Sequence, residues 1–453
     1  MKYLKILALI AIAIGVNAVS PFILGRLPVG METFWILSLI LGFGWACSEV
    51  SKGTIFPSFT LQLGVSILLH DALSPLSSQT MIIVVVCSVL AAIILKSGGD
   101  EVERRLFGKI ALPTILIATL GYIVAFFALL FLALAIGIEG KTAALLAAII
   151  GSTDPASLIP TLKDVRFKPE YKRLVDISVA ESAINDAVGA IFTGAVIIMI
   201  QSGVDVASIG NVLTGISEPH NLTHLGKELA IGAIAGLVGW FIMRLYEKHK
   251  SDNHETSYDF GVVLAVPIFV FVLAAFFGGN GFLAAFITGL LANYNHSNHR
   301  FGRTLQVMET KIDSLAKPTI FMMAGPLVSV GDLWQNAFTG FAISMLFIFF
   351  VRPVAVFVSL LWPLLRKKIV IKEALFLCGV RETGVIAIVL TVITLKSFPE
   401  LTTLMPLVAW VVIWTLTLLP AITPWWAKTL GLTEESKKET HEEPDLSRMP
   451  AHS

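Results

Sequence analysis

Long apolar segments separated by short polar or charged stretches restrict the fold of this chain more than any other feature of its sequence. About 20 apolar residues in a helix cross the hydrocarbon core of a bilayer. Fourteen segments approach or exceed this length, at about 3–25, 32–50, 54–70, 80–97, 109–137, 141–163, 171–201, 227–247, 256–277, 279–294, 315–330, 336–365, 371–395 and 402–427. Only 14% of the residues are charged, whereas a soluble domain has about 25%. The sequence therefore predicts an all-α polytopic membrane protein that has the lipid bilayer as its solvent.

The first apolar segment allows two interpretations. Lys2 and Lys5 precede an apolar run that leads to Val16-Asn17-Ala18, a pattern that resembles a signal peptide with its cleavage site. The apolar run continues through Leu24, however, and is then long enough to span a membrane. We expect an uncleaved extra N-terminal helix within residues 1–31, which gives fourteen transmembrane helices, whereas cleavage would leave thirteen.

The distribution of lysine and arginine predicts the orientation of the chain in the cell membrane. If the N-terminus is cytoplasmic and the segments alternate, 26 of the 33 basic residues fall on the cytoplasmic side and 4 on the outer side. Basic residues concentrate in cytoplasmic loops, so we expect both termini in the cytoplasm. The polar tail at 429–453 is predicted to be short and disordered. Lys96, Arg352 and Arg381 remain at membrane depth.

A polar break, Ser152-Thr153-Asp154-Pro155, interrupts the apolar segment at 141–163. Proline removes a backbone donor and disfavours helical geometry at the residue before it. A helix broken at this point would expose carbonyl and amide groups, which a bilayer tolerates only beside a polar cavity. The alternative is a kinked helix whose second half is capped by Asp154. The two interpretations are compatible, because a cap on a broken helix is part of the same site.

The segment at 171–201 carries a second polar set. Glu181 and Asn185 are four residues apart and share one helix face, while Ser182 and Asp186 share an adjacent face. Ionisable residues inside a span cost roughly 2.5–3.5 kcal/mol each and therefore indicate function. Glu181 and Asp186 point roughly 140° apart on a helix of 3.6 residues per turn, so we expect them to have different tasks.

The C-terminal part of the chain contains a third and a fourth polar feature. Arg352 lies deep in an apolar segment and requires an anion, because a guanidinium group stays protonated. Arg381 and Glu382 lie between two glycines at 379 and 384, with an apolar stretch on each side. This arrangement predicts a second broken helix.

The polar features follow the same order in two parts of the chain, at 109–201 and at 336–427. Paired interrupted segments in corresponding positions point to a transporter whose site lies near the midplane, between inverted repeats with two broken helices that cross there. We therefore predict an ion-binding core formed by these two parts within a membrane domain at 32–428. The remaining segments would form the scaffold and the dimer contacts.

The polar blocks also carry a resemblance to a known family. Ser-Thr-Asp-Pro at 152–155 followed by Glu181-Ser182-Ala183-Ile184-Asn185-Asp186 resembles the sodium/proton antiporters of the monovalent cation–proton antiporter superfamily, in the NhaP-like branch. Gly279-Asn280-Gly281-Phe282, Val351-Arg352-Pro353-Val354 and Gly379-Val380-Arg381 resemble further blocks of this family in the same order. The resemblance extends from about residue 32 to residue 428.

The resemblance implies a role for each polar residue. Asp186 would bind the transported ion and the proton, and Na+ would be held by Asp186 and Asp154. The residues that would help to line the site are Asn185, Asp154, Thr153 and Ser182. Glu181 and Arg352 would form a structural ion pair, while Arg381 and Glu382 would lie at the second helix break.

Two departures from the family pattern leave the ion selectivity open. Lys96-Ser97-Gly98-Gly99 stands where relatives have Phe-Glu-Gly-Gly, so an acidic residue is missing there. Glu382 replaces a small residue after Arg381, and it would neutralise that arginine.

Together these features predict a secondary active transporter that exchanges Na+ or Li+ for H+ by alternating access. One acidic residue occupies the Asn185-Asp186 pair, so the exchange is predicted to be electroneutral, with one proton per ion. The first alternative is a K+/H+ antiporter, and a less favoured one is a proton-coupled symporter or a cation channel. Carboxylate, hydroxyl and carbonyl oxygens suit small hard cations.

Other function classes are not expected. The histidines lie in loops or at segment ends, without a metalloprotease or serine-hydrolase pattern, so an enzyme is not predicted. The net charge of +1 argues against a nucleic-acid partner, and no cofactor is expected. A homodimer is implied by the family resemblance alone.

Overall fold

The computed structural model describes residues 2–28, 30–54, 56–102, 104–153, 162, 165–253, 259–292 and 299–434, without the side chains of 104–109 and 299–303. These residues form helices joined by turns and short connections, with one isolated antiparallel bridge between Phe167 and Thr433. The predicted all-α membrane fold is confirmed by this architecture. Asp154 and Pro155, at the predicted first helix break, lie outside the described residues.

The helices of the first half are α1 (Lys2–Leu24), α2 (Met31–Ser51), α3 (Ser58–Leu68), α4 (His70–Leu73), α5 (Thr80–Glu101), α6 (Arg104–Leu116), α7 (Tyr122–Ala135), α8 (Gly140–Ile149), α10 (Arg173–Gln201), α11 (Ile209–Ser217) and α12 (Pro219–Asp252). Those of the second half are α13 (Phe260–Phe276), α14 (Gly281–Ala292), α15 (His299–Met323), α16 (Val330–Gln335), α17 (Ala337–Leu346), α18 (Arg352–Ser359), α19 (Leu361–Leu365), α20 (Ile371–Cys378), α21 (Val385–Ser397) and α22 (Leu404–Thr429). Short 3₁₀ turns lie at Ser74–Gln79, Pro169–Tyr171 and Gly325–Leu327.

Within the described residues, eight helical stretches are long and apolar enough to cross a membrane, and five shorter apolar helices accompany them. Each apolar segment predicted from the sequence contains at least one helix. α15 begins at His299, well before the apolar segment expected from about 315. Its early turns are polar, so apolar length alone does not predict them. They are stabilised in part by Glu309, which forms a buried ion pair with Lys96 of α5.

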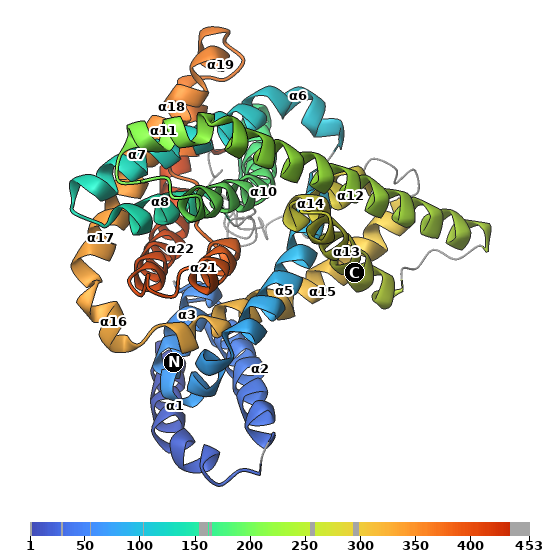
Figure 1. Ribbon diagram of the computed structural model, residues 1–453. Coiled ribbons are helices and arrows are strands. Elements are labelled where there is room, and N and C mark those ends of the chain that lie inside the picture. The colour runs from blue at the N-terminus through green and yellow to red at the C-terminus, as the bar shows by residue number, and fades with distance from the viewer. Residues whose placement is uncertain are drawn as a thin grey trace, which may run out of the picture.

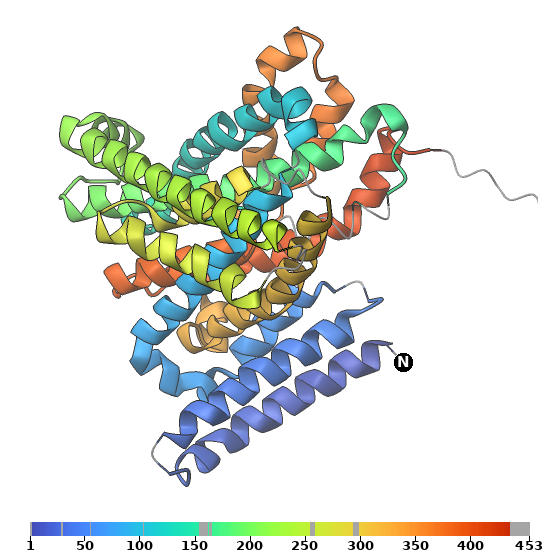
Figure 2. The same cartoon turned by 90° about the vertical axis from the view of Figure 1, so that its right-hand side faces the viewer.

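α5 lies between three groups of helices (Figure 1). It packs against α14 in the group formed by α12, α13 and α14, and against α15, which in turn contacts α2 and α3. On its remaining side it packs against α10 and α21, the group that also contains α8 and α22. Figure 2 shows α1 and α2 side by side at one edge of the molecule, where the N-terminus lies. α5 therefore contacts all three groups.

Backbone-to-backbone contact joins α5 to α14. A Cβ atom at Gly99 would overlap the carbonyl oxygen of Phe286, and a Cβ atom at Gly289 would overlap the carbonyl oxygen of Lys96. Only glycine permits two helices to approach this closely. Gly99 and Gly289 are therefore needed for packing between the two helices.

Two long helical stretches contain a π-helical turn at comparable positions. One turn, Ile117–Gly121, joins α6 to α7, and the other, Phe347–Val351, joins α17 to α18. α18 packs against the first turn, and α7 packs against the second. Such turns insert a residue into a helix and re-aim the side chains that follow. Arg352 follows the second turn directly, and Tyr122 follows the first.

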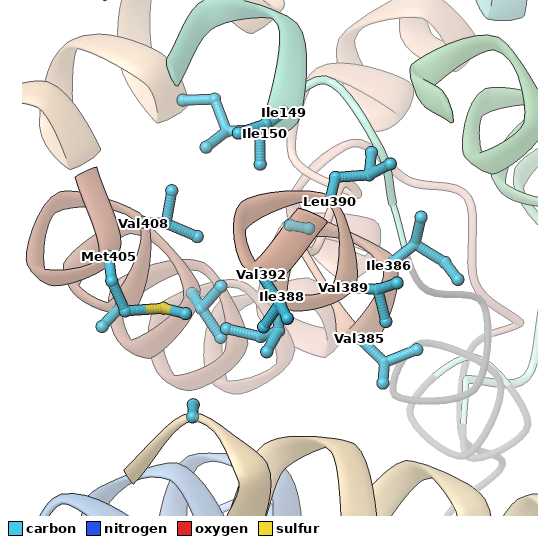
Figure 3. Close-up of a cluster of buried hydrophobic side chains, with 14 of the residues drawn as sticks. Ile149, Ile150, Val385, Ile386, Ile388, Val389, Leu390, Val392, Met405 and Val408 are labelled. Atoms are coloured by element: carbon cyan, nitrogen blue, oxygen red, sulfur yellow. The ribbon is translucent and has the colours of Figure 1, made fainter. Parts of the chain in front are cut away.

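The predicted second broken helix is confirmed by the structure. α20 ends at Cys378, residues 379–384 are non-helical, and α21 begins at Val385. α8 likewise ends at Ile149, and a turn leads to Ser152 and Thr153. Buried apolar side chains pack around both helix ends: Figure 3 shows Ile149 and Ile150 together with Val385, Ile386, Leu390 and Val408. The two interrupted segments therefore meet in an apolar surrounding.

A capping box fixes the start of α16. Asp332 N donates to Ser329 Oγ at 3.1 Å, and Ser329 N donates to Asp332 Oδ2 at 3.1 Å. The Ser329 hydroxyl also donates to that carboxylate at 2.7 Å. We expect Ser329→Ala to destabilise this helix by about 1 kcal/mol. Amide hydrogen exchange in Val330–Gln335 should then accelerate about fivefold at neutral pH. Unchanged exchange would contradict the role of the cap.

The same contacts predict a pH dependence. Hydrogen bonds from the Ser329 hydroxyl and backbone N–H lower the pKa of Asp332. The carboxylate therefore stabilises the helix fully above the ordinary aspartate pKa of about 3.9. This contribution is lost as the pH falls through the lowered pKa, so the difference between wild type and variant should shrink in acid.

Candidate functional site

A buried ion pair lies where α10, α18 and α20 meet. Arg352 Nη1 donates to Glu181 Oε1 at 2.6 Å, and Nη2 donates to Glu181 Oε2 at 3.0 Å. The two side chains are only 2% and 4% exposed. Arg352 Nε also donates to the Leu377 carbonyl oxygen at 3.1 Å, near the end of α20. One guanidinium group thus connects α10, α18 and α20.

Three uncharged polar side chains continue this network. Ser182 Oγ donates to Thr153 Oγ1 at 2.8 Å, and Asn185 Nδ2 contacts Glu181 Oε1 at 3.3 Å and Thr153 Oγ1 at 3.5 Å. Asn185 is completely buried. Residues from the end of the α8 segment and from the middle of α10 are thereby brought into direct contact. The structure places Thr153, Glu181, Ser182 and Asn185 in one polar cluster.

Asp186 follows Asn185 on α10 and is only 5% exposed. One turn later, the Cβ position of Gly189 lies 3.1 Å from Ser152 Cβ and 3.6 Å from the Tyr122 hydroxyl oxygen. The α10 turn that carries Asp186 is therefore packed against the end of the α8 segment. Asp154, the other predicted carboxylate of the site, lies outside the described residues.

Arg381 and Thr383 connect the second helix break to the end of the α8 segment. The Arg381 guanidinium donates to the Gly151 carbonyl oxygen, and Thr383 Oγ1 donates to the Ile150 carbonyl oxygen at 3.4 Å. The end of a helix carries a partial negative charge on its last carbonyl groups. The guanidinium therefore stabilises the carbonyl end of α8. Glu382, the next residue, is buried as well.

Tyr122 belongs to this arrangement but was not predicted from the sequence. Its hydroxyl donates to the carbonyl oxygen of Ala148 in the last turn of α8, and its ring covers Gly151, where a Cβ atom would overlap the ring. Tyr122 thus satisfies one of the carbonyl groups that the helix end leaves without a helical partner. In the sequence it follows Gly121 within an ordinary apolar run, which gives no signal of this role.

The ion pair predicts a strong effect on stability. Glu181→Gln would leave the Arg352 charge buried without its carboxylate, and we expect a loss of about 3–5 kcal/mol in the free energy of unfolding. The Glu181→Gln/Arg352→Gln double variant should lose less than Glu181→Gln alone, because it leaves no unpaired charge. Thermal unfolding in detergent, followed by tryptophan fluorescence, measures both.

The exposed pair between Glu49 and Lys52 provides the matched control, since its carboxylate and ammonium lie 2.6 Å apart with both side chains more than half exposed. Glu49→Gln should change the stability by about 1 kcal/mol or less. An effect of Glu181→Gln as small as that of Glu49→Gln would contradict the structural importance of the buried pair.

Comparisons with known proteins identify the family of this chain. The family model described as "Sodium/hydrogen exchanger, transmembrane" matches residues 7–429. The K(+)/H(+) antiporter NhaP2 of Shewanella baltica (strain OS223) is 26% identical over 324 residues, which cover 69% of this chain and 51% of that protein. The K(+)/H(+) antiporter NhaP of Alkalimonas amylolytica is 26% identical over 313 residues, 67% of this chain and 50% of that protein. The chain thus spans about half the length of these curated relatives.

A solved structure shares the fold. The sodium proton antiporter MjNhaP1 from Methanocaldococcus jannaschii at pH 8 superposes with a TM-score of 0.72 at 20% sequence identity, covering 89% of this chain and 98% of that one. The family match extends over nearly all of the helices described above. The chain belongs to the transmembrane sodium/hydrogen exchanger family, in the NhaP-like branch of the monovalent cation–proton antiporters, as its polar motifs indicated.

Proposed function

We propose that this protein is a secondary active transporter that exchanges Na+ or Li+ for H+, with Asp186 as the carboxylate that binds either ion. The observation that supports this most is the position of Asp186, a buried carboxyl group on α10 next to the Thr153–Ser182–Asn185 cluster. A buried carboxyl group either carries a proton or has a positive charge beside it, from a side chain or a bound cation. Competition between a proton and a cation at one group couples their fluxes in opposite directions.

The surroundings of Asp186 suit a small hard cation. Hydroxyl, amide and carboxylate oxygens are the donors that such cations prefer, and the cluster contains Thr153, Ser182 and Asn185. Within the described residues, Asn185 Oδ1 is buried and accepts no hydrogen bond. We propose Asn185, Thr153 and Ser182 as lining residues, together with Asp154.

The ion pair and the second break have supporting tasks in this proposal. Glu181 is committed to Arg352 by two hydrogen bonds, and Asp176 is only partly buried in the first turn of α10. Asp186 is therefore our candidate for the exchanging carboxylate. Arg381 supplies a fixed positive charge at the carbonyl end of the α8 segment. That charge can balance the site in the moment when neither ion is bound, and Glu382 moderates it.

Alternating access would come from movement of the core at about 109–201 and 336–427 against the remaining helices. Carriers with broken helices and a midplane site work in this way. The lysine and arginine distribution supports a cytoplasmic orientation of both termini, and we also expect a homodimer, on the family resemblance. A homodimer would use the helices outside the core, which then serve as the fixed frame.

K+ is a second candidate for the transported cation. The curated relatives named above are K(+)/H(+) antiporters, whereas the matching structure is of a sodium proton antiporter. We favour Na+ or Li+ because the polar motifs resemble those of sodium/proton antiporters, and K+ is the alternative. A proton-coupled symporter or a channel is less well supported, since the polar residues gather at two helix breaks.

The Asp186→Asn variant tests the proposal directly. An amide cannot exchange a proton for a cation, so cation-dependent dequenching of a pH-sensitive dye in proteoliposomes should fall to the level of empty vesicles. The wild type should respond to Na+ and Li+ more strongly than to K+. Asp332→Asn, which alters an exposed aspartate outside the site, should retain exchange.

Exchange that persists in Asp186→Asn would refute Asp186 as the binding group. A wild-type response to K+ alone would overturn the Na+ assignment and establish the alternative, with the antiport mechanism intact. No response to any of the three cations, in protein shown to be folded, would contradict antiport itself.

A separate prediction concerns stoichiometry. Because Asp186 is one carboxylate next to a neutral amide, it should carry one proton or one monovalent cation in each half-cycle. Exchange should therefore move no net charge and be insensitive to a membrane potential imposed with valinomycin and K+ gradients, in vesicles loaded with Na+. A transport current on a solid-supported membrane that scales with the cation gradient would contradict one-to-one exchange.

A further inference from the structure

An exposed surface that is both apolar and basic lies at the end of α19. This short helix follows the apolar stretch Ala337–Ser359 and projects with α18 from the body of the molecule (Figure 1). Three of its apolar side chains are exposed, and three exposed basic residues come directly after it. We refer to these residues together as the α19 surface: Leu361, Trp362, Leu365, Arg366, Lys367 and Lys368.

The order of side chains along this stretch matches the change from lipid tails to headgroups. The stretch Ala337–Ser359 is long and apolar enough to cross a membrane, so α19 begins where the chain leaves the hydrocarbon core. Exposed leucines at 361 and 365 come first, together with Trp362, a residue type enriched at the membrane surface. Residues 361–372 contain four basic residues and no acidic one. Basic clusters of this size next to a span attract anionic lipid headgroups.

Arg366 is held at the level of Trp362. Its Cζ atom lies 4.5 Å from the centroid of the Trp362 ring, and such a cation–π contact fixes a side chain that is otherwise flexible. Because an indole ring rests at the membrane surface, the guanidinium group is kept at the same depth. A guanidinium group binds phosphate through two parallel hydrogen bonds. Arg366 is therefore placed to receive the phosphate of a headgroup.

Lys367 has a backbone conformation that usually requires glycine. Its φ is +53°, and within the described residues no other residue apart from glycine has a positive φ. Lys367 N donates to the Leu364 carbonyl oxygen at 3.0 Å, and Lys368 N donates to the Pro363 carbonyl oxygen at 2.9 Å, which closes the end of α19. Glycine would make this turn with less strain. A strained residue of another type indicates that its side chain has a task.

The α19 surface is firmly attached to helices of the candidate site. Ile369, which follows it, is buried in an apolar cluster with Phe376 of α20. Val370 N donates to Glu373 Oε2 at 2.9 Å, and Glu373 accepts two hydrogen bonds of 2.7 Å from Arg173 at the start of α10. A ligand on the α19 surface would therefore act on the first turns of both α10 and α20.

We propose that the α19 surface binds the headgroup of an anionic phospholipid. Its three basic side chains hold the phosphate group, while the two leucines and Trp362 lie against the acyl chains. The apolar side chains favour a lipid over free phosphate, because inorganic phosphate offers them no contact. This site does not involve Asp186 and does not depend on the proposed transport reaction.

Native mass spectrometry of the purified full-length protein in detergent tests the proposal, with phosphatidylglycerol as the anionic probe and phosphatidylcholine as the neutral one. The wild type should bind the first phosphatidylglycerol about tenfold or more tightly than phosphatidylcholine, because each basic residue contributes about fivefold near an anionic surface. The Arg366→Gln/Lys367→Gln/Lys368→Gln variant should lose most of this preference. An excess of inorganic phosphate should not displace the lipid.

The Lys2→Gln/Lys5→Gln/Lys52→Gln variant is the matched control. It removes three exposed lysines from α1 and from the position after α2, so the net charge changes equally while the α19 surface is unchanged. This variant should keep the preference for phosphatidylglycerol. A loss as large as that of the α19 variant would show an effect of net charge and would overturn the site.

The Lys367→Gly variant separates lipid binding from a purely structural role. It relieves the turn, so the lipid-free protein should be at least as stable to heat as the wild type, yet phosphatidylglycerol binding should weaken about fivefold. Lys367→Arg should retain the binding. Equal binding of the two lipids by the wild type, unchanged binding in both the triple α19 variant and Lys367→Gly, or displacement by inorganic phosphate would overturn the lipid site.

Discussion

The fold depends on the bidentate contact between Glu181 and Arg352. An arginine at this depth has no water and stays charged, so its carboxylate partner is a condition for the surrounding helices to pack at all. The same guanidinium donates to Leu377 O, which fixes the end of α20 just before the second break. The π-helical turn Phe347–Val351 immediately precedes Arg352 and sets the direction of its side chain. One ion pair thus positions α10, α18 and α20 relative to one another.

A second set of contacts satisfies the polar groups that broken helices leave exposed. Arg381, Thr383 and Tyr122 donate to the carbonyl oxygens of Gly151, Ile150 and Ala148, so the second helix break and the start of α7 both meet the end of α8. Each carbonyl group left bare in an apolar interior would cost several kcal/mol, which explains why side chains from distant parts of the sequence gather there. The apolar side chains around them (Figure 3) keep the arrangement compact. The polar cluster on α10 is therefore held from two sides.

The sequence predicted the features that depend on local composition and missed those that depend on distant contacts. Apolar length predicted the transmembrane helices, and the glycines and charges at 379–384 predicted the second break. The partners of Lys96 were not predictable, because Glu309 is 213 positions away and no local pattern marks it. Tyr122 and the two π-helical turns lie in apolar runs that look like ordinary spans. The pairing of Glu181 with Arg352 was predicted from the family resemblance. The sequence around Arg352 showed that it needs an anionic partner but did not show which residue that partner is.

The glycine contacts of α5 also bear on how this protein can move. On one face, Gly99 and Gly289 bring the backbones of α5 and α14 into interlocking contact, so these two helices must travel as a single body. On the other face, α5 meets α10 through Gly98 and the methyl group of Ala183, at an ordinary van der Waals distance of 3.8 Å. Helices that meet through small side chains lack the interlocking ridges and grooves of larger side chains. One such helix can slide along the other while few contacts break. In the proposed alternating-access cycle, the α5–α10 surface is where the core would slide, and a larger side chain at Gly98 would resist that movement.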